Sequence, residues 1–228
     1  MRQSNVFSLA ALQSAAVCLA IASLSLLGAS DSSLTTLLSG VDRHYNQAHT
    51  LSVDFTETYS LAGRSHRPES GQLVLRKPGR MRWTYSDPPG KLFVSDGQTV
   101  YLYTAADNRV ERSRLKATDD LRAPMAFLLG RLNLKNDFRG FETNPAPNGT
   151  YLIAEAKNDR LPYGKIRMLI GPDLQIQELT IDGRDGSVLG FVFRNEKLNP
   201  PVPDAAFHFT IPAGAELVDA VNSPSGDN

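Results

Sequence analysis

The chain has 228 residues, with 24 Lys+Arg against 24 Asp+Glu, 41% hydrophobic residues, 17 Gly, 14 Pro and one Cys. These values are typical of one globular domain, and they argue against a disordered chain, a collagen-like repeat, a disulfide scaffold and a multi-span membrane protein. The balanced charge also argues against nucleic-acid binding, which depends on a clustered excess of Lys and Arg.

The first thirty residues have the layout of a secretory signal peptide. Arg2 precedes a run without any charged residue up to Ser30, with a short apolar core at Val17–Leu27 and small residues behind it. A retained membrane anchor is the alternative, because the uncharged run is long enough to span a bilayer. Its many Ser and Ala residues favour cleavage, near Ala29 or Ser30.

The single cysteine, Cys18, lies inside this apolar core. Val17 before it is too bulky for the small residue that lipoprotein processing requires, so a lipid anchor is not expected. We therefore divide the chain into a signal peptide, residues 1–30, and one domain, residues 31–228. The domain has no cysteine, so its stability must come from its core, and about 200 residues can bury a sizeable one.

The domain is expected to begin with a helix and to continue as strands. Apolar residues recur at helical spacing from Leu34 to Ala48, behind candidate N-caps at 31–33. From Leu51 the period becomes two, which is typical of a strand with one wet face. The same alternation predicts strands at Gly71–Arg76, Arg80–Tyr85, Lys91–Ser95, Thr99–Tyr103, Arg109–Ser113, Thr150–Ala156, Lys165–Ile170, Gln175–Asp182, Ser187–Arg194 and Phe207–Ile211. Turn signals separate these strands, which favours an antiparallel sheet that curls or closes.

One segment between the two groups of strands has a different pattern. Ala123–Leu134 reads APMAFLLGRLNL, in which Pro124 can open a helix and apolar residues follow at spacings of three and four. This short helix is either a plug over one end of the core or a movable lid over a ligand cavity.

Catalytic motifs are weak in this sequence. The four histidines, His44, His49, His66 and His208, do not stand at metal-ligand spacing with other ligand types. The chain has no G-x-S-x-G, P-loop or G-x-G-x-x-G pattern. We therefore expect no enzyme, no cofactor and no metal site.

The most informative block is Gly71–Tyr103. If the turn at 78–79 preserves the alternation, one side of the hairpin is apolar and carries a single lysine at its edge. That side holds Leu73, Leu75, Lys77, Met81, Trp83 and Tyr85, whereas Val74, Arg76, Arg80, Arg82 and Thr84 form a cationic, wet side. Core packing explains the apolar residues, but a lysine on a core face needs backbone carbonyls or solvent for its amine.

At this block the sequence closely resembles the periplasmic outer-membrane lipoprotein carrier family (LolA). The shared features are G-x-L-x-x-(R/K)-(R/K)-P-x-x-x-x-W at 71–83, Pro88, V-S-D-G at 94–97, Y-x-Y at 101–103, P-x-x-x-L-L at 124–129 and F-x-F-T-x-P-x-G at 207–214. The resemblance implies an incomplete, unclosed antiparallel β-barrel, with a lid of short α-helices over an apolar cavity.

The resemblance also implies a transport function without enzymatic activity. Members take acylated lipoproteins from an ATP-driven release complex of the inner membrane, cross the periplasm of a Gram-negative envelope and deliver them to an outer-membrane receptor. We expect a monomer in this role. Family knowledge further suggests that the C-terminal strand near Phe207–Val218 makes the transfer one-way.

In this family a basic residue before the proline holds the empty cavity closed by hydrogen bonds to the lid backbone. That position is Lys77 here, where an arginine is usual, and the expected partners are the carbonyls of Tyr45, Leu128 and Leu129. Lysine offers a point charge instead of a planar fork, which predicts a looser latch. The expected cavity residues are Leu51, Val53, Phe55, Leu73, Leu75, Met81 and Trp83. Simple core packing stays open as the alternative at each of them.

Two other functions fit the same pattern. One is the lipid-anchored outer-membrane acceptor of the same fold, which would need a processed cysteine at its N-terminus. The other is an extracytoplasmic β-barrel module that binds another apolar ligand or a regulatory partner.

Overall fold

The computed structural model describes residues 32–115, 132–159 and 161–219. The signal peptide, Leu128 and Leu129, and most of the predicted helix Ala123–Leu134 therefore lie outside the described residues.

The chain divides into two compact units between Gly40 and Val41. A helix covers residues 32–46, as expected, and its residues from Val41 onward belong to the larger unit together with all the strands. In the described part of the chain no helix is both long and apolar enough to cross a bilayer.

The larger unit is built on one sheet. Its strands are β1 (Thr50–Leu61), β2 (Arg64–Ser65), β3 (Glu69–Arg76), β4 (Arg80–Asp87), β5 (Lys91–Asp96), β6 (Thr99–Thr104), β7 (Arg109–Arg114), β8 (Phe138–Ala146), β9 (Gly149–Ala156), β10 (Tyr163–Ile170), β11 (Ile176–Gly183), β12 (Ser187–Leu198) and β13 (Glu216–Asp219). A short helix, α2 (Leu134–Asp137), precedes β8, and a 3-10 turn, η3 (Asp204–Phe207), follows β12.

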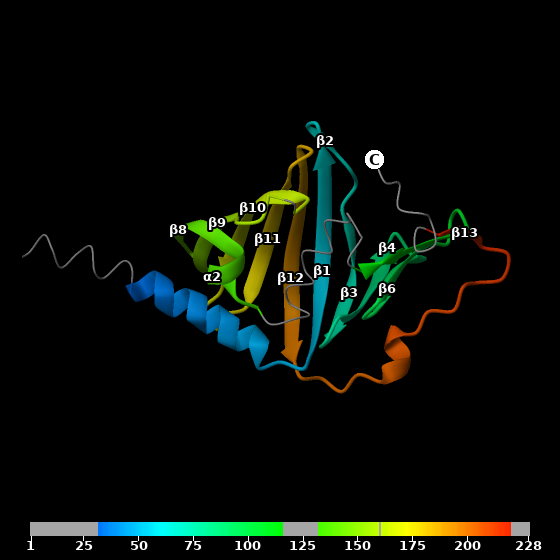
Figure 1. Ribbon diagram of the computed structural model, residues 1–228, viewed down its shortest axis with the longest axis horizontal. Helices are drawn as coiled ribbons and strands as arrows, with labels where there is room; N and C mark the ends of the chain where they lie inside the picture. The colour runs from blue at the N-terminus through cyan, green and yellow to red at the C-terminus, as the bar shows by residue number, and fades with distance from the viewer. Residues whose placement is uncertain (1–31, 116–131, 160, 220–228) are drawn as a thin grey trace, which may run out of the picture. The chain divides into compact units, whose positions relative to one another are not determined.

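The sheet is continuous but not closed. Its strand order is β13-β7-β6-β5-β4-β3-β1-β12-β11-β10-β9-β8, with β2 beside β1 (Figure 1). Neighbours are antiparallel apart from β13, which runs parallel to β7. Strands β8 and β13 form the two edges, so the prediction of a mainly β, unclosed antiparallel architecture is confirmed.

The turn between β3 and β4 preserves the alternation of inward and outward side chains on which the predicted apolar side depended. Leu75 pairs with Met81 and Leu73 with Trp83, while Arg76 pairs with Arg80 on the other side. The turn between them places Gly79 at a φ of 70°. Because this turn preserves the alternation, the apolar and cationic residues of the block lie on opposite faces of the sheet.

Gly71 lets β3 and β4 approach each other closely. A Cβ at this position would lie 2.1 Å from the carbonyl oxygen of Thr84, which is backbone and cannot turn away. We expect Gly71→Ala to lower the free energy of unfolding by about 2 kcal/mol or more, the usual cost of overpacking. Gly164→Ala is the matched control, because its nearest neighbour is an arginine side chain 3.7 Å away. Urea unfolding of both variants checks this, and equal losses would contradict the close approach at Gly71.

The predicted strand at Phe207–Ile211 is wrong. Residues 204–207 form η3, and the chain makes no strand again until β13. Four prolines stand at 200, 201, 203 and 212. Proline has no N–H to donate to a neighbouring strand, so this proline-rich segment does not extend the sheet as a strand. Alternation predicted neither β8 nor β13, because neither shows a clear alternation of apolar and polar residues. Strand β13 overlaps only the end of the C-terminal strand near Phe207–Val218 that the resemblance suggested.

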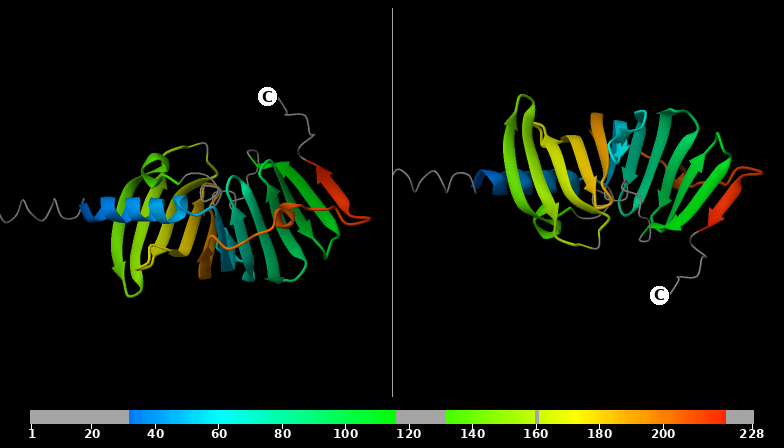
Figure 2. Two further views of the ribbon diagram at one scale, coloured as in Figure 1. Left: turned by 90° about the horizontal axis from the view of Figure 1, so that it is seen from below. Right: turned by 90° about the horizontal axis from the view of Figure 1, so that it is seen from above.

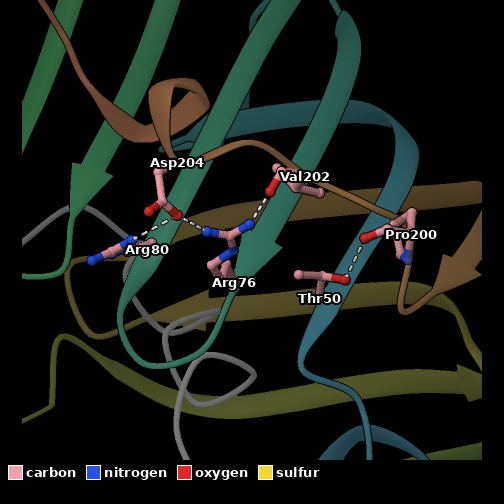
Figure 3. A network of polar contacts seen from close by, with 6 residues as sticks. All are labelled: Thr50, Arg76, Arg80, Pro200, Val202 and Asp204. Atoms are coloured by element: carbon pink, nitrogen blue, oxygen red, sulfur yellow. Dashed lines mark hydrogen bonds and ion pairs between the residues drawn. The ribbon is translucent and has the colours of Figure 1, made fainter.

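Residues 199–215, here called the C-terminal strap, instead cross the outer face of the sheet. In the left view of Figure 2 they run from the end of β12 across the strands that lead to β13. Figure 3 shows how they are held: Thr50 Oγ1 donates to the Pro200 carbonyl at 2.7 Å, and the Arg76 guanidinium donates to the Val202 carbonyl and pairs with Asp204.

Arg82 extends this contact by donating to the Ala206 carbonyl at 3.1 Å, and burial lowers its pKa. The Arg76 side chain is 24% exposed. The interpretation of this face as wet is therefore wrong where the strap covers it, because the arginines bind backbone carbonyls there.

Candidate functional site

The inner face of the sheet gathers the residues that the sequence analysis assigned to a cavity. All seven are buried, with exposed fractions between 0% and 5%. Phe55 and Trp83 meet edge to face with ring centroids 4.8 Å apart, and Trp83 lies 5.4 Å from Phe191 of β12. Strands β1, β3, β4 and β12 therefore share one continuous apolar surface.

Two small pockets open on this surface. One is lined by Tyr45, Leu51, Val53, Leu73, Ile176, Leu179, Phe193 and Glu196. The other is lined by Tyr45, Ala48, His49, Thr50, Leu51, Leu75 and Lys77. The free space in each is about enough for one water molecule. A long acyl chain therefore enters either of these two pockets only if the groups that line it move apart.

The seven residues divide into two groups. Leu51, Val53, Leu73 and Leu75 line one or both pockets. Phe55, Met81 and Trp83 line neither of these two pockets and pack against their neighbours, which favours core packing for them in this closed arrangement.

Lys77 lines the second pocket. Its Nζ donates to the Tyr45 carbonyl at 2.6 Å, and its own N–H donates to the His49 carbonyl at 2.9 Å. Burial lowers the pKa of the Lys77 ammonium. A hydrogen bond from an ammonium to a carbonyl is stronger than a neutral one, so this contact ties the end of the N-terminal helix to the turn after β3.

Tyr45 forms the centre of a second polar contact that the sequence did not predict. Its hydroxyl donates to Glu196 Oε2 at 2.8 Å and accepts from the Ile176 N–H at 2.7 Å. His44 Nε2 lies 2.8 Å from the other oxygen of Glu196. Burial, assisted by the charge of Glu196, raises the pKa of Tyr45 well above its usual value. A neutral Tyr45 thus joins the helix to β11 and β12.

Asn46 makes the third polar contact of the helix. Its side chain donates to the Leu132 carbonyl and accepts from the Leu132 N–H, both at 2.7 Å. One turn earlier, Asp42 Oδ1 accepts from the Leu134 N–H at 3.1 Å. Both contacts hold the C-terminal end of the predicted lid segment. Helical spacing placed Asp42 and Asn46 on the polar face of the helix, and neither contact was predicted, because polar residues on a helix usually face solvent.

Burial raises the pKa of the Asp42 carboxyl from its ordinary value of 3.8. The folded protein then binds this proton more tightly than the unfolded chain, so the Asp42 contribution to stability falls as pH rises through this range. We expect the unfolding free energy of Asp42→Asn, relative to the wild type, to increase between about pH 3 and about pH 7. Urea unfolding across that range measures it.

Asp185 provides a control of opposite sign. Hydrogen bonds from the Ser187 hydroxyl and N–H lower the pKa of Asp185, so its stabilising contribution appears as pH rises. The relative stability of Asp185→Asn should fall over the same range. If the relative unfolding free energies of the two variants changed equally with pH, burial could not be the cause of a raised pKa at Asp42.

Known proteins resemble this chain in amino-acid sequence. The family described as "Outer membrane lipoprotein carrier protein LolA" matches residues 46–210. An outer-membrane lipoprotein carrier protein of Chromobacterium violaceum is 28% identical over 169 residues, covering 74% of this chain and 81% of that protein. One of Cupriavidus pinatubonensis is 31% identical over 153 residues, covering 65% and 69%.

The fold has a solved counterpart as well. The crystal structure of an uncharacterized conserved protein from Thermus thermophilus matches with a TM-score of 0.50 and 13% identity, covering 82% of this chain and 99% of that chain. This likeness concerns the fold alone. The family match spans β1 to η3, and thus the inner face, Lys77 and every pocket residue except Tyr45, which lies just before the matched range. The chain belongs to the LolA family of outer membrane lipoprotein carrier proteins.

Proposed function

We propose that this chain is a non-enzymatic carrier of acylated lipoproteins. It receives them from an ATP-driven release complex of the inner membrane, crosses the periplasm and hands them to an outer-membrane receptor. The observation that carries the proposal is the buried apolar face with small pockets, closed at one end by the Lys77 contact to Tyr45. The names of the relatives support the same function.

Physical chemistry explains why such a carrier is needed. Each exposed methylene of an acyl chain costs about 0.8 kcal/mol in water, so a lipoprotein with several chains does not cross an aqueous space unaided. An apolar face with few hydrogen-bonding groups binds acyl chains without selecting the attached protein. This permits one carrier to serve many lipoproteins.

The polar contacts around the pockets supply the closing force. Loading separates the groups that line the pockets, which breaks the Lys77 bond to Tyr45 and loosens the Asn46 contact with Leu132. Their re-formation favours release. The affinity of the empty carrier is therefore reduced by the cost of opening, and a receptor needs only a modestly better apolar site.

Native mass spectrometry tests this function directly. The protein is purified without detergent from the periplasm of a Gram-negative host, and the mass of any bound molecule is measured. We expect a fraction loaded one-to-one with a lipoprotein. A different apolar molecule in that fraction would contradict the proposal and favour another extracytoplasmic binding role.

A further inference from the structure

Four polar residues stand side by side on the inner face, away from the latch. They are Glu57 of β1, Glu69 of β3, Tyr85 of β4 and Lys91 of β5, here called the polar row. Glu57 pairs directly with Glu69 across the strands. The Tyr85 hydroxyl donates to Glu57 Oε2 at 2.7 Å. Lys91 forms an ion pair with Glu69, and its Nζ lies 4.5 Å from the centre of the Tyr85 ring.

The burial of this row has an energetic cost. Glu57 is 6% exposed and Tyr85 3% exposed, and the next inward residue of β1 is the apolar Phe55. A buried carboxylate is unfavourable unless hydrogen bonds compensate it, and an apolar residue would serve the core as well or better. The row therefore suits a task other than packing.

The position of the row indicates the task. Lys77 lies near the start of β1, because its neighbour Arg76 pairs with Thr50. The polar row lies further along β1, at Glu57. Seven residues of strand separate Thr50 from Glu57, about 23 Å at the usual rise of a strand. Apolar side chains fill the inner face between, so it has the latch at one end and hydrogen-bonding groups at the other.

We infer that the polar row binds the polar head of the acylated ligand, while the acyl chains extend along β1 toward Lys77. This inference rests on the carrier function proposed above. Carboxylate oxygens of Glu57 and Glu69 accept from amide N–H groups next to the chains. The Lys91 ammonium donates to ester or amide carbonyls. The row thus sets the direction in which a lipopeptide enters.

Two isosteric variants test the inference, because each keeps the volume of the side chain. Glu57→Gln and Tyr85→Phe are compared with Tyr163→Phe. Tyr163 is 6% exposed and belongs to β10, which lies on the other side of β1 from β3, β4 and β5 in the sheet order. Binding is measured by displacement of a fluorescent lipid probe. The ligands are a synthetic tripalmitoylated cysteinyl peptide and palmitic acid. Thermal unfolding of each variant reports its stability.

Both row variants should bind the lipopeptide at least about tenfold more weakly, the effect of one lost hydrogen bond to a charged group, and bind palmitic acid as the wild type does. Tyr163→Phe should change neither affinity. Parallel losses for both ligands, or no loss for the lipopeptide, would overturn the subsite. If the wild type binds palmitic acid but not the lipopeptide, the carrier function itself fails and the subsite with it.

Discussion

Lys77→Leu is expected to raise the affinity of the empty carrier for an acylated peptide about tenfold and to slow release by a similar factor. Lys77 Nζ donates to the Tyr45 carbonyl, and in the proposed carrier mechanism this bond stabilises the closed arrangement and is lost on opening. A hydrogen bond of a charged group contributes about 1.5–3 kcal/mol, and 1.4 kcal/mol already shifts such an equilibrium tenfold. Stopped-flow binding and release of a fluorescent lipopeptide measure both quantities.

The chain offers a matched control for this variant. Lys157 Nζ also donates to a backbone carbonyl at 2.6 Å, that of Lys135, but lines neither pocket. Lys157→Leu should leave binding and release unchanged, while Lys77→Arg should keep or tighten closure. Equal kinetics for the Lys77 and Lys157 leucine variants would show that Lys77 does not act as a latch.

Trp83→Ala is expected to lower the free energy of unfolding by about 3–5 kcal/mol, the range for truncating a buried aromatic residue. Trp83 is fully buried between Phe55 and Phe191 and lines neither pocket. Its removal opens a cavity at the centre of the inner face. Urea unfolding followed by far-UV circular dichroism measures the loss, because the variant has no tryptophan fluorescence.

Leu217→Ala is the control for this prediction, because Leu217 is 40% exposed. It should change the unfolding free energy by less than about 0.5 kcal/mol. A loss below about 1 kcal/mol at Trp83 would indicate that its site collapses without cost, and would favour a cavity wall over a packed core there.

Alternation along the strands was enough to predict the inner face. Leu73, Leu75, Met81 and Trp83 face inward because a strand turns successive side chains to opposite sides and the turn at Gly79 preserves the alternation. The same rule failed at Phe207, where local alternation was present but the surrounding prolines provide no N–H for pairing.

The polar contacts around the pockets could not be predicted from local pattern. Asn46 and Leu132 are 86 residues apart, and Tyr45 and Glu196 are 151 apart. Their meeting depends on how β11, β12 and the helix end are brought together by the whole sheet. Lys77 was found because a lysine on an apolar face is unusual. Glu57 falls in phase with Leu51, Val53 and Phe55 and gave the same kind of signal, which was not used.

A transfer assay tests the carrier function most directly. Inner-membrane vesicles or spheroplasts that contain a radiolabelled lipoprotein and a matched release complex are incubated with the purified protein and ATP, then separated into membrane and soluble fractions. The expected result is a soluble one-to-one complex of lipoprotein and carrier. Retention of all the lipoprotein in the membrane fraction would contradict the carrier function and leave the family likeness as a likeness of fold.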